Sequence, residues 1–290
     1  KIVEDASGND IGNTTINLGQ DLYYKIDFKN IGNDNVTNFT LEDVLPKNVI
    51  FNYPADITSL PVGVTHTYNA ATRRLTFTIP DALVKIGDPL HTIRLHVKVV
   101  SDYNLFSDAC SNEVKNQAFA NYRGVVNTTP VVGEGSFAST VCNFGAPSST
   151  NFLANIDGYT FTRNQVLCGS SVVLNASNGY DTYSWSTSPT GSPVIGTNQT
   201  YTATSTGTYY VSSVSNGSCK SIKEEITVIP YGNTITNPVI PYAESPYKGE
   251  VVTCPNNGKK LPNIFLCGAN ASRLIQTNIT DASSIEWQKL

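Results

Sequence analysis

The sequence lacks several features that mark common protein classes. Its 290 residues contain no methionine and only three histidines, and charged residues make up 14% of the chain. No apolar run approaches the ~20 residues that a transmembrane helix needs, so we expect no transmembrane segment. The formal net charge of −4 is spread along the chain and offers no basic stripe for phosphates. Nucleic acid is therefore excluded as an expected partner.

Catalytic motifs are missing as well. The chain has no Gly-x-Ser-x-Gly elbow, no His-Glu-x-x-His motif, no phosphate-binding loop and no dinucleotide fingerprint. His91 and His96 lie five residues apart near one predicted strand, so they point to opposite faces and cannot chelate one metal ion. The adjacent acids Glu42-Asp43 and Glu224-Glu225 also point apart, and we interpret both pairs as solvated charge. We predict that the protein is not an enzyme.

The residues that are abundant suit β-structure. Thr and Tyr fit pleated surfaces, whereas Asn, Gly and Ser form turns. Hydrophobic residues make up 40% of the chain, which is enough to build cores. The length predicts two or three domains. The missing methionine and the abrupt end at Leu290 lead us to expect a piece of a larger exported protein, with any targeting sequence outside it.

The first part of the chain alternates apolar and polar residues in the manner of half-buried strands. Residues 21–28 place Leu22, Tyr24, Ile26 and Phe28 on one face. The same reasoning predicts further strands over residues 36–41, 74–79, 92–100 and 112–122, the last of which closes the domain.

The middle of the chain has the features of an immunoglobulin-like sandwich. Short strands are predicted at even spacing over 172–174, 182–186, 199–203, 207–214 and 225–229. Trp185 occupies the position of the core tryptophan of strand C, and residues 206–211 match the approach to strand F, where a tyrosine caps a corner. Val211 stands where an immunoglobulin domain has its second cysteine, so the usual disulfide between the sheets is missing.

An internal repeat follows. Cys168-Gly169 precedes Trp185 much as Cys267-Gly268 precedes Trp287. We predict an all-β fold of tandem immunoglobulin-like β-sandwich domains, the last one incomplete. The domains are a β-sandwich with its boundary loop over 1–146, an immunoglobulin-like domain over 147–232, and a linker with the start of a further domain over 233–290.

The six cysteines indicate disulfides. None lies in a C-x-x-C pair and the histidines are remote from them, which argues against zinc and for an oxidising compartment. We predict that Cys168 pairs with Cys219 and that Cys110 pairs with Cys142. For Cys267 two alternatives stay open: a bridge to Cys254, or no partner within the chain.

The sequence suggests three further kinds of site. The Asx-rich loops 5–10 and 33–35 offer oxygen ligands for Ca²⁺, although such loops more often only turn the chain; no other cofactor is expected. Tyr180 with Tyr183, or Tyr242 with Tyr247, is a candidate stacking platform for a glycan. A covalent lysine–asparagine bond is a third hypothesis, in which Lys25 or Lys29 joins Asn116 or Asn121.

Two resemblances set the expected function. Residues 19–24, 29–33 and 41–46 resemble the conserved-repeat β-sandwich domain of bacterial surface proteins, which implies a spacer or stalk. Residues 142–151, the module around Trp185 and residues 259–268 resemble the C-terminal modules of gliding-motility-associated adhesins of Bacteroidota, which the type IX secretion system exports. This resemblance implies a protein outside the cell, attached to the outer membrane.

The resemblance also implies partners and leaves a second function open. The expected partners are an extracellular surface or polysaccharide and the outer-membrane proteins that secrete and anchor such adhesins. We therefore predict non-catalytic stalk or adhesion modules that serve surface attachment and gliding motility. The alternative is a carbohydrate-binding module of a secreted polysaccharide-degrading enzyme.

Overall fold

The computed structural model describes residues 1–139, 146–230, 239–240 and 276–277. The chain divides into two compact units. Unit 1 comprises residues 1–106 and 110–158, and unit 2 comprises residues 107–109 and those from 159 onward. Strands account for 48% of the described residues and helices for 3%, so the predicted all-β fold is confirmed. Within the described ranges, no helix is long and apolar enough to cross a membrane.

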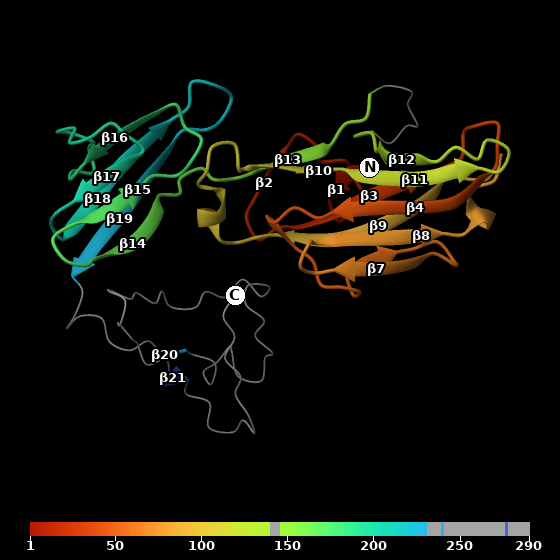
Figure 1. Ribbon diagram of the computed structural model, residues 1–290, viewed down its shortest axis with the longest axis horizontal. Helices are drawn as coiled ribbons and strands as arrows, with labels where there is room; N and C mark the ends of the chain where they lie inside the picture. Colours follow the sequence, from red (N-terminus) through yellow and green to blue (C-terminus); the bar gives the residue numbers. More distant parts are fainter. Residues whose placement is uncertain (140–145, 231–238, 241–275, 278–290) are drawn as a thin grey trace. The chain divides into compact units, whose positions relative to one another are not determined.

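Three sheets build unit 1 (Figure 1). The first has the order β1-β3-β9-β5, with β6 also paired to β9; the second has the order β12-β11-β4-β8-β7; and the third has the order β10-β13-β2. The bounds are β1 Ile2–Glu4, β2 Thr15–Ile16, β3 Asp21–Phe28, β4 Val36–Val44, β5 Val49–Ile50, β6 Ile57–Ser59, β7 Thr65–Asn69, β8 Arg74–Ile79, β9 His91–Val99, β10 Glu113–Asn116, β11 Ala118–Gly124, β12 Val131–Gly135 and β13 Thr150–Ala154, with short 3-10 helices η1 Asp81–Leu83 and η2 Tyr103–Phe106.

The core of unit 1 follows the alternation of the sequence. In β3 the four residues predicted to share a face are all buried, and their neighbours are more exposed. β3 pairs antiparallel with β9, where the inward residues are equally well buried. Because side chains alternate across a strand, one register buries both sets of apolar residues together. This agreement confirms the predicted strands over 21–28, 74–79 and 92–100.

The predicted single strand over 112–122 is wrong in one respect. The segment forms two strands in different sheets, because β10 pairs with β13 whereas β11 pairs with β4 and β12. Gln117 separates them, and its side-chain amide donates to the carbonyl oxygen of Ser136 at 3.0 Å. The chain therefore changes sheets at this residue, as strands at the corners of sandwiches do.

Unit 2 contains a four-stranded sheet ordered β14-β19-β18-β16 and a two-stranded sheet of β15 and β17 (Figure 1). The bounds are β14 Phe161–Leu167, β15 Val172–Asn175, β16 Thr182–Ser186, β17 Thr200–Ala203, β18 Gly207–Val214 and β19 Ile222–Pro230. Trp185 is fully buried at the centre of the core and donates its indole N–H to the Asn198 carbonyl at 2.8 Å. Its predicted core position is confirmed.

The corner before β18 also forms as the sequence indicates. The Tyr209 hydroxyl donates to the carbonyl oxygen of Ser205 at 3.0 Å, four residues upstream. Val211, in the position of the missing cysteine, is buried beside the other core residues. An apolar contact thus replaces the usual disulfide at this point of the sandwich.

The boundary between the units differs from the expected position after residue 146. Unit 1 extends to Gly158 because Thr150, Phe152 and Ala154 alternate into its core from β13. Conversely, Ser107–Ala109 belongs to unit 2. Most of the expected third segment, 233–290, lies outside the described residues; within it, β20 Val239–Ile240 and β21 Gln276–Thr277 pair in parallel.

Candidate functional site

Two of the tyrosines proposed to bind a glycan, Tyr180 and Tyr183, make hydrogen bonds within unit 2. Tyr180 is only 8% exposed, and its hydroxyl donates to the Ser107 carbonyl at 3.0 Å. The Tyr183 hydroxyl donates to the Ser177 carbonyl at 3.1 Å, and the two rings meet edge to face. Burial raises the pKa of the Tyr180 phenol well above its usual range, and the negative charge of Glu224 raises it further. The two rings therefore do not form the exposed stacking surface that the glycan hypothesis requires. Tyr242 and Tyr247 lie outside the described residues.

The disulfide pattern corrects the predicted pairing. A disulfide joins Cys110 to Cys219, and Cys168 is also disulfide-bonded. The predicted pairs Cys110–Cys142 and Cys168–Cys219 are therefore wrong. Spacing in the sequence pairs each cysteine with a near neighbour, but the segment directly before Cys110 belongs to unit 2, which also holds Cys219. Cys142, Cys254 and Cys267, and with them the open question about Cys267, lie outside the described residues.

The loops proposed to bind Ca²⁺ use their carboxylates to shape the chain. Asp5 accepts backbone N–H groups from Ser7 and Asn9, each at 2.9 Å. Asp34 accepts backbone N–H groups from Val126 and Asn127, also at 2.9 Å. Hydrogen bonds from Asn9, first of all from its side-chain amide, lower the pKa of the Asp5 carboxyl, and the backbone N–H groups of Asn127 and Val126 lower that of Asp34. Among the residues that the structure describes, no group of three or more His, Cys, Asp or Glu side chains is placed to hold a metal ion.

Two carboxylates that the sequence interpretation placed in solvent are buried. Asp43 is 0% exposed and Glu224 is 1% exposed, so the interpretation of both acidic pairs as solvated charge is wrong for one member of each. The alternation of residues along each strand could have predicted this burial. Asp43 shares the inward face of β4 with Phe39 and Leu41, and Glu224 shares that of β19 with Ile226. A carboxylate on an apolar face must find partners.

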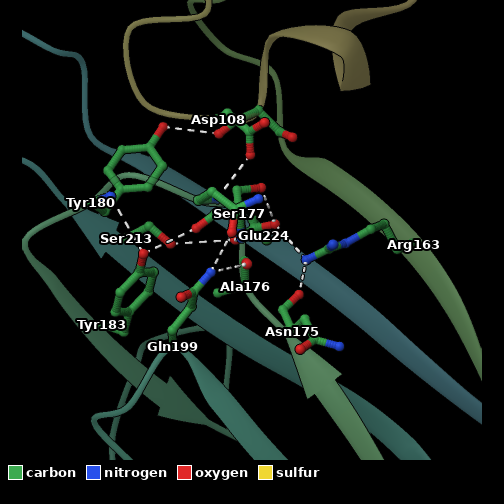
Figure 2. Close-up of polar contacts among 12 residues, drawn as sticks. Asp108, Arg163, Asn175, Ala176, Ser177, Tyr180, Tyr183, Gln199, Ser213 and Glu224 are labelled. Carbon is green, nitrogen blue, oxygen red and sulfur yellow. Dashed lines mark hydrogen bonds and ion pairs between the residues drawn. The ribbon is translucent and has the colours of Figure 1, made fainter.

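Glu224 finds a complete set of partners in unit 2 (Figure 2). Its Oε1 accepts from Arg163 Nη2 at 2.6 Å and from the Ser177 hydroxyl at 2.8 Å. Its Oε2 accepts from the Ser177 backbone N–H at 2.9 Å and from the Ser213 hydroxyl at 3.3 Å. Four donors match the roughly four acceptor sites of a carboxylate. This cluster joins β14, β18 and β19 and is satisfied as it stands.

Asp43 has a less complete environment in unit 1. Its Oδ2 lies 2.5 Å from Lys1 Nζ, and both side chains are buried, with exposed fractions of 0% for Lys1 and 1% for Asp43. Lys1 Nζ also lies 4.5 Å from the centre of the Tyr24 ring. Three groups in this cluster are buried without a hydrogen-bond partner, namely Asp43 Oδ1, the Tyr24 hydroxyl and both polar atoms of the Asn116 side chain. Unlike the Glu224 cluster, this one leaves donors and acceptors unused.

The strands at the two ends of unit 2 are joined directly. β14, the first strand, pairs in parallel with β19, the last, through seven consecutive residues from Phe161↔Glu224 to Leu167↔Pro230. β14 was not predicted, because only Phe161 and Val166 of its residues are buried and no alternation marks it. Among the described residues it forms an edge strand, since β19 is its one neighbour in the sheet.

Unit 1 also contains a cleft of about 570 Å³ beside β3, β4, β11 and β12. Phe39 and Tyr122 line it with ring centres 6.0 Å apart, and the Tyr122 hydroxyl donates to Glu134 Oε2 at 2.5 Å. Burial and this contact with Glu134 raise the pKa of Tyr122 to about 12. The lining has no set of converging reactive groups that would indicate catalysis.

Comparisons with known proteins agree with the fold of unit 2. Residues 159–230 match a family of immunoglobulin-like domains described as CHU_C-associated. This match begins where unit 2 resumes after Gly158. No curated protein matches the chain. The chain is therefore an all-β protein of tandem β-sandwiches with an immunoglobulin-like domain in its second unit.

Solved structures show similarity at low identity. The full-length major pilin SpaD from Corynebacterium diphtheriae is 13% identical, with 79% of this chain and 65% of the pilin covered and a TM-score of 0.34. The C-terminal domain of the antigen I/II-family protein AspA from Streptococcus pyogenes is 14% identical, with 52% of this chain and 45% of that domain's chain covered and a TM-score of 0.31. The chain thus spans less than two thirds of either protein.

Proposed function

We propose that the chain is a non-catalytic stalk segment of a secreted bacterial adhesin and transmits tension between the cell and the surface that it contacts. The observation that carries the proposal is the parallel pairing of β14 with β19. The chain enters unit 2 at the start of β14 and leaves β19 at its end, and in a parallel pair these two points lie at opposite ends of the strands.

This geometry determines how unit 2 meets a pulling force. Tension on its two ends pulls β14 and β19 in opposite directions along their own axes. All the ladder hydrogen bonds between the seven residue pairs are then loaded together, whereas an antiparallel hairpin pulled at its ends opens one bond at a time. Forced unfolding is governed by the barrier to unfolding, and shared loading raises that barrier. When the Cys110–Cys219 disulfide is open, we therefore expect unit 2 to resist force better than its equilibrium stability alone indicates; when it is closed, the bridge itself transmits the tension past β14.

Single-molecule pulling on the full chain tests this proposal. The experiment is made in reductant, because the Cys110–Cys219 disulfide otherwise carries the load past β14. Alternate residues of a parallel strand donate to the neighbouring strand, so either Asn164→Pro or Gln165→Pro removes a hydrogen bond between β14 and β19. We expect one of these variants to lower the unfolding force of unit 2.

Thr202→Pro is the matched control. Thr202 is exposed on β17, which pairs with β15. The pulling force does not act directly on this pair of strands, because the chain enters and leaves unit 2 through β14 and β19. Proline also lowers the equilibrium stability of the Thr202→Pro variant, because it disturbs a strand, but the force that unfolds unit 2 should change little. Equal forces in all three variants would contradict the proposal.

We further propose that the parent adhesin belongs to the gliding-motility-associated proteins of Bacteroidota, leaves the cell by type IX secretion and is held at the outer membrane. The resemblance of residues 259–268 and the match of residues 159–230 to a CHU_C-associated family support this assignment. Antibodies against unit 1 should label intact cells of the source bacterium. Loss of the secretion machinery should abolish the labelling, and labelling that persists without that machinery would contradict this assignment.

A further inference from the structure

Unit 1 contains the parts of a covalent cross-linking site around Tyr24. We propose that the side chains of Lys1 and Asn116 join in an intramolecular amide bond, with Asp43 as the acid catalyst and ammonia as the product that leaves. This hypothesis differs from the one drawn from the sequence, which placed the lysine at position 25 or 29. Lys25 instead lies 3.6 Å from Glu4 and 3.5 Å from Asp27, so its charge is already neutralised.

Four side chains from four strands or their ends meet at this site. Lys1 precedes β1, Tyr24 lies in β3, Asp43 in β4 and Asn116 ends β10. Lys1 and Asn116 are each 4% exposed, Tyr24 is 1% exposed and Asp43 is 0% exposed. Lys1 Nζ contacts Asp43 and the Tyr24 ring, and the Asn116 side chain lies near enough to the Tyr24 hydroxyl to affect its pKa.

The unused groups distinguish this cluster from an ordinary buried ion pair. An amide that is buried without hydrogen bonds destabilises the folded state, and Asn116 leaves both its amide atoms in this condition. A buried lysine–carboxylate pair also carries a desolvation cost that its attraction does not fully offset. Formation of an amide between Lys1 and Asn116 removes the lysine charge and consumes the unsatisfied amide, so both costs fall.

The site can perform this step without any added reagent. Burial lowers the pKa of the Lys1 amine, although the neighbouring Asp43 partly opposes the shift. Transfer of the proton from Lys1 to Asp43 leaves a neutral amine and a carboxylic acid, the uncharged pair that a dry interior favours. The amine nitrogen can then attack Asn116 Cγ while the acid donates a hydrogen bond to Asn116 Oδ1.

The atoms balance over the whole step. The new bond joins Lys1 Nζ to Asn116 Cγ, and the bond from Cγ to Nδ2 breaks. Asp43 transfers its proton to the departing nitrogen, and the attacking amine loses a proton back to Asp43. One lysine amine and one asparagine amide thus give one secondary amide and one ammonia, with no oxidant or cofactor.

Mass spectrometry of the intact chain, fully reduced, tests the proposal. The expected mass is about 17 Da below that of the sequence, which corresponds to one ammonia. Trypsin cleaves after Lys115 and Arg123, so the digest should contain the peptide 116–123 joined to the peptide that carries Lys1. The joined peptide is decisive, because succinimide formation at an Asn-Gly pair such as Asn178-Gly179 also releases ammonia.

Asp43→Asn, with Glu42→Gln as its matched control, tests the role of the acid. Asp43→Asn keeps the shape of the side chain but cannot donate a carboxylic proton, so the rate of cross-linking should fall about 10²–10³-fold, as for loss of a single catalytic donor. Glu42 lies next to it on the exposed face of β4 and pairs with Arg74, and Glu42→Gln should cross-link at the rate of the unchanged chain. Circular dichroism of both variants confirms that they fold.

Full mass in the unchanged chain and no joined peptide would overturn the proposal, as would an equal cross-linking rate in the two variants. Lys1→Arg gives a further check, since it retains the positive charge beside Asp43 but should never give the joined peptide. Failure of the cross-link leaves the β14–β19 pairing and the proposed stalk function unaffected, because those rest on unit 2.

Discussion

The two units bury a carboxylate on the inward face of a central strand, but they provide for it in different ways. In unit 2, both oxygens of Glu224 accept two hydrogen bonds each. In unit 1, Asp43 has one charged partner, one unpartnered oxygen and an unpartnered amide nearby. A complete set of partners indicates a structural role, whereas an incomplete one leaves groups that can react. The comparison therefore separates a polar anchor from a candidate reaction site.

The units also differ in how their ends are held. Unit 2 joins its first and last strands through seven parallel residue pairs. The last strand of unit 1, β13, has parallel pairing over only two residues, Leu153↔Thr15 and Ala154↔Ile16, and its partner β2 is not the first strand. With the disulfide open, backbone pairing can secure unit 2 under tension, but the described part of unit 1 has no equivalent ladder between its first and last strands. A covalent bond from Lys1 to Asn116 would supply what that ladder does not.

The largest expected effect comes from loss of the Cys110–Cys219 disulfide. The bridge closes a loop of roughly 110 residues, for which the chain-entropy estimate is about 4.7 kcal/mol of stability. In pulling experiments, reductant or the double variant Cys110→Ser with Cys219→Ser should release about 110 further residues at ~3.5 Å each. Equal extension in oxidised and reduced chains would show that the bridge does not carry load.

This disulfide also sharpens the comparison of the units. Its span, 110–219, overlaps the span 1–116 of the proposed amide, so the two bonds together would leave little of residues 1–219 able to extend. If only the disulfide exists, residues 1–110 should still extend in the oxidised chain, whereas residues 111–218 stay within the closed loop. The extension before and after reduction therefore reports separately on each bond.

Substitution of Glu224 should have the next largest effect, confined to unit 2. Glu224→Ala leaves the buried donors of Ser177 and Ser213 without an acceptor, and we expect a loss of about 3 kcal/mol. Glu225→Ala is the matched control, because Glu225 is half-buried on the opposite face of the same strand and should change stability by roughly 0.5 kcal/mol or less. Differential scanning calorimetry, which follows the unfolding of both units, measures both changes.

The outcome of this pair decides whether the units are independent. In Glu224→Ala we expect the unfolding temperature of unit 2 to fall and that of unit 1 to stay the same. This result would support the division into two units. Equal losses in the two variants would contradict the structural role assigned to Glu224.

The fold was largely predictable from the sequence because alternation is a local signal. Leu22 to Phe28 and the core tryptophan Trp185 required no knowledge of distant contacts. The edge strand β14 was missed because its polar residues hide the pattern, and the boundary was misplaced because β13 follows a loop-rich stretch. The partner of Cys110 depends on how the chain returns to it over more than a hundred residues, which spacing cannot reveal.

The candidate sites were less predictable for a related reason. Parity marks Asp43 and Glu224 as inward, but it does not say which groups will face them. Lys1 stands outside any alternating run, so no sequence pattern connects it with Asp43 or Asn116. Only the arrangement of β1, β4 and β10 brings these side chains into one part of unit 1.

The smallest expected effect is a pH dependence confined to unit 1. His96 lies between two carboxylates, with Nδ1 2.9 Å from Asp56 Oδ1 and Nε2 3.0 Å from Asp21 Oδ1. Partial burial lowers the pKa of His96, but its hydrogen bonds to Asp56 and Asp21 and their negative charges together raise the pKa above its usual value. Because the folded state binds the proton more tightly than the unfolded chain, the extra stability is fully present below the unfolded pKa of about 6.5.

This stability is lost as the pH rises through the higher pKa of the folded state. For a partly exposed ion pair we expect a difference of about 1 kcal/mol or less across that range. His96→Gln should remove the contribution of this ion pair to the fall in the stability of unit 1 with rising pH, as measured by chemical denaturation between about pH 6 and pH 8. His66→Gln is the control, since that ring is bonded to the Tyr53 hydroxyl and to no carboxylate, and it should retain the pH dependence. If the unchanged chain becomes more stable as the pH rises, His96 does not bind its proton more tightly in the folded state. An equal change of unfolding free energy with pH in unit 2 would show that the effect is not confined to unit 1.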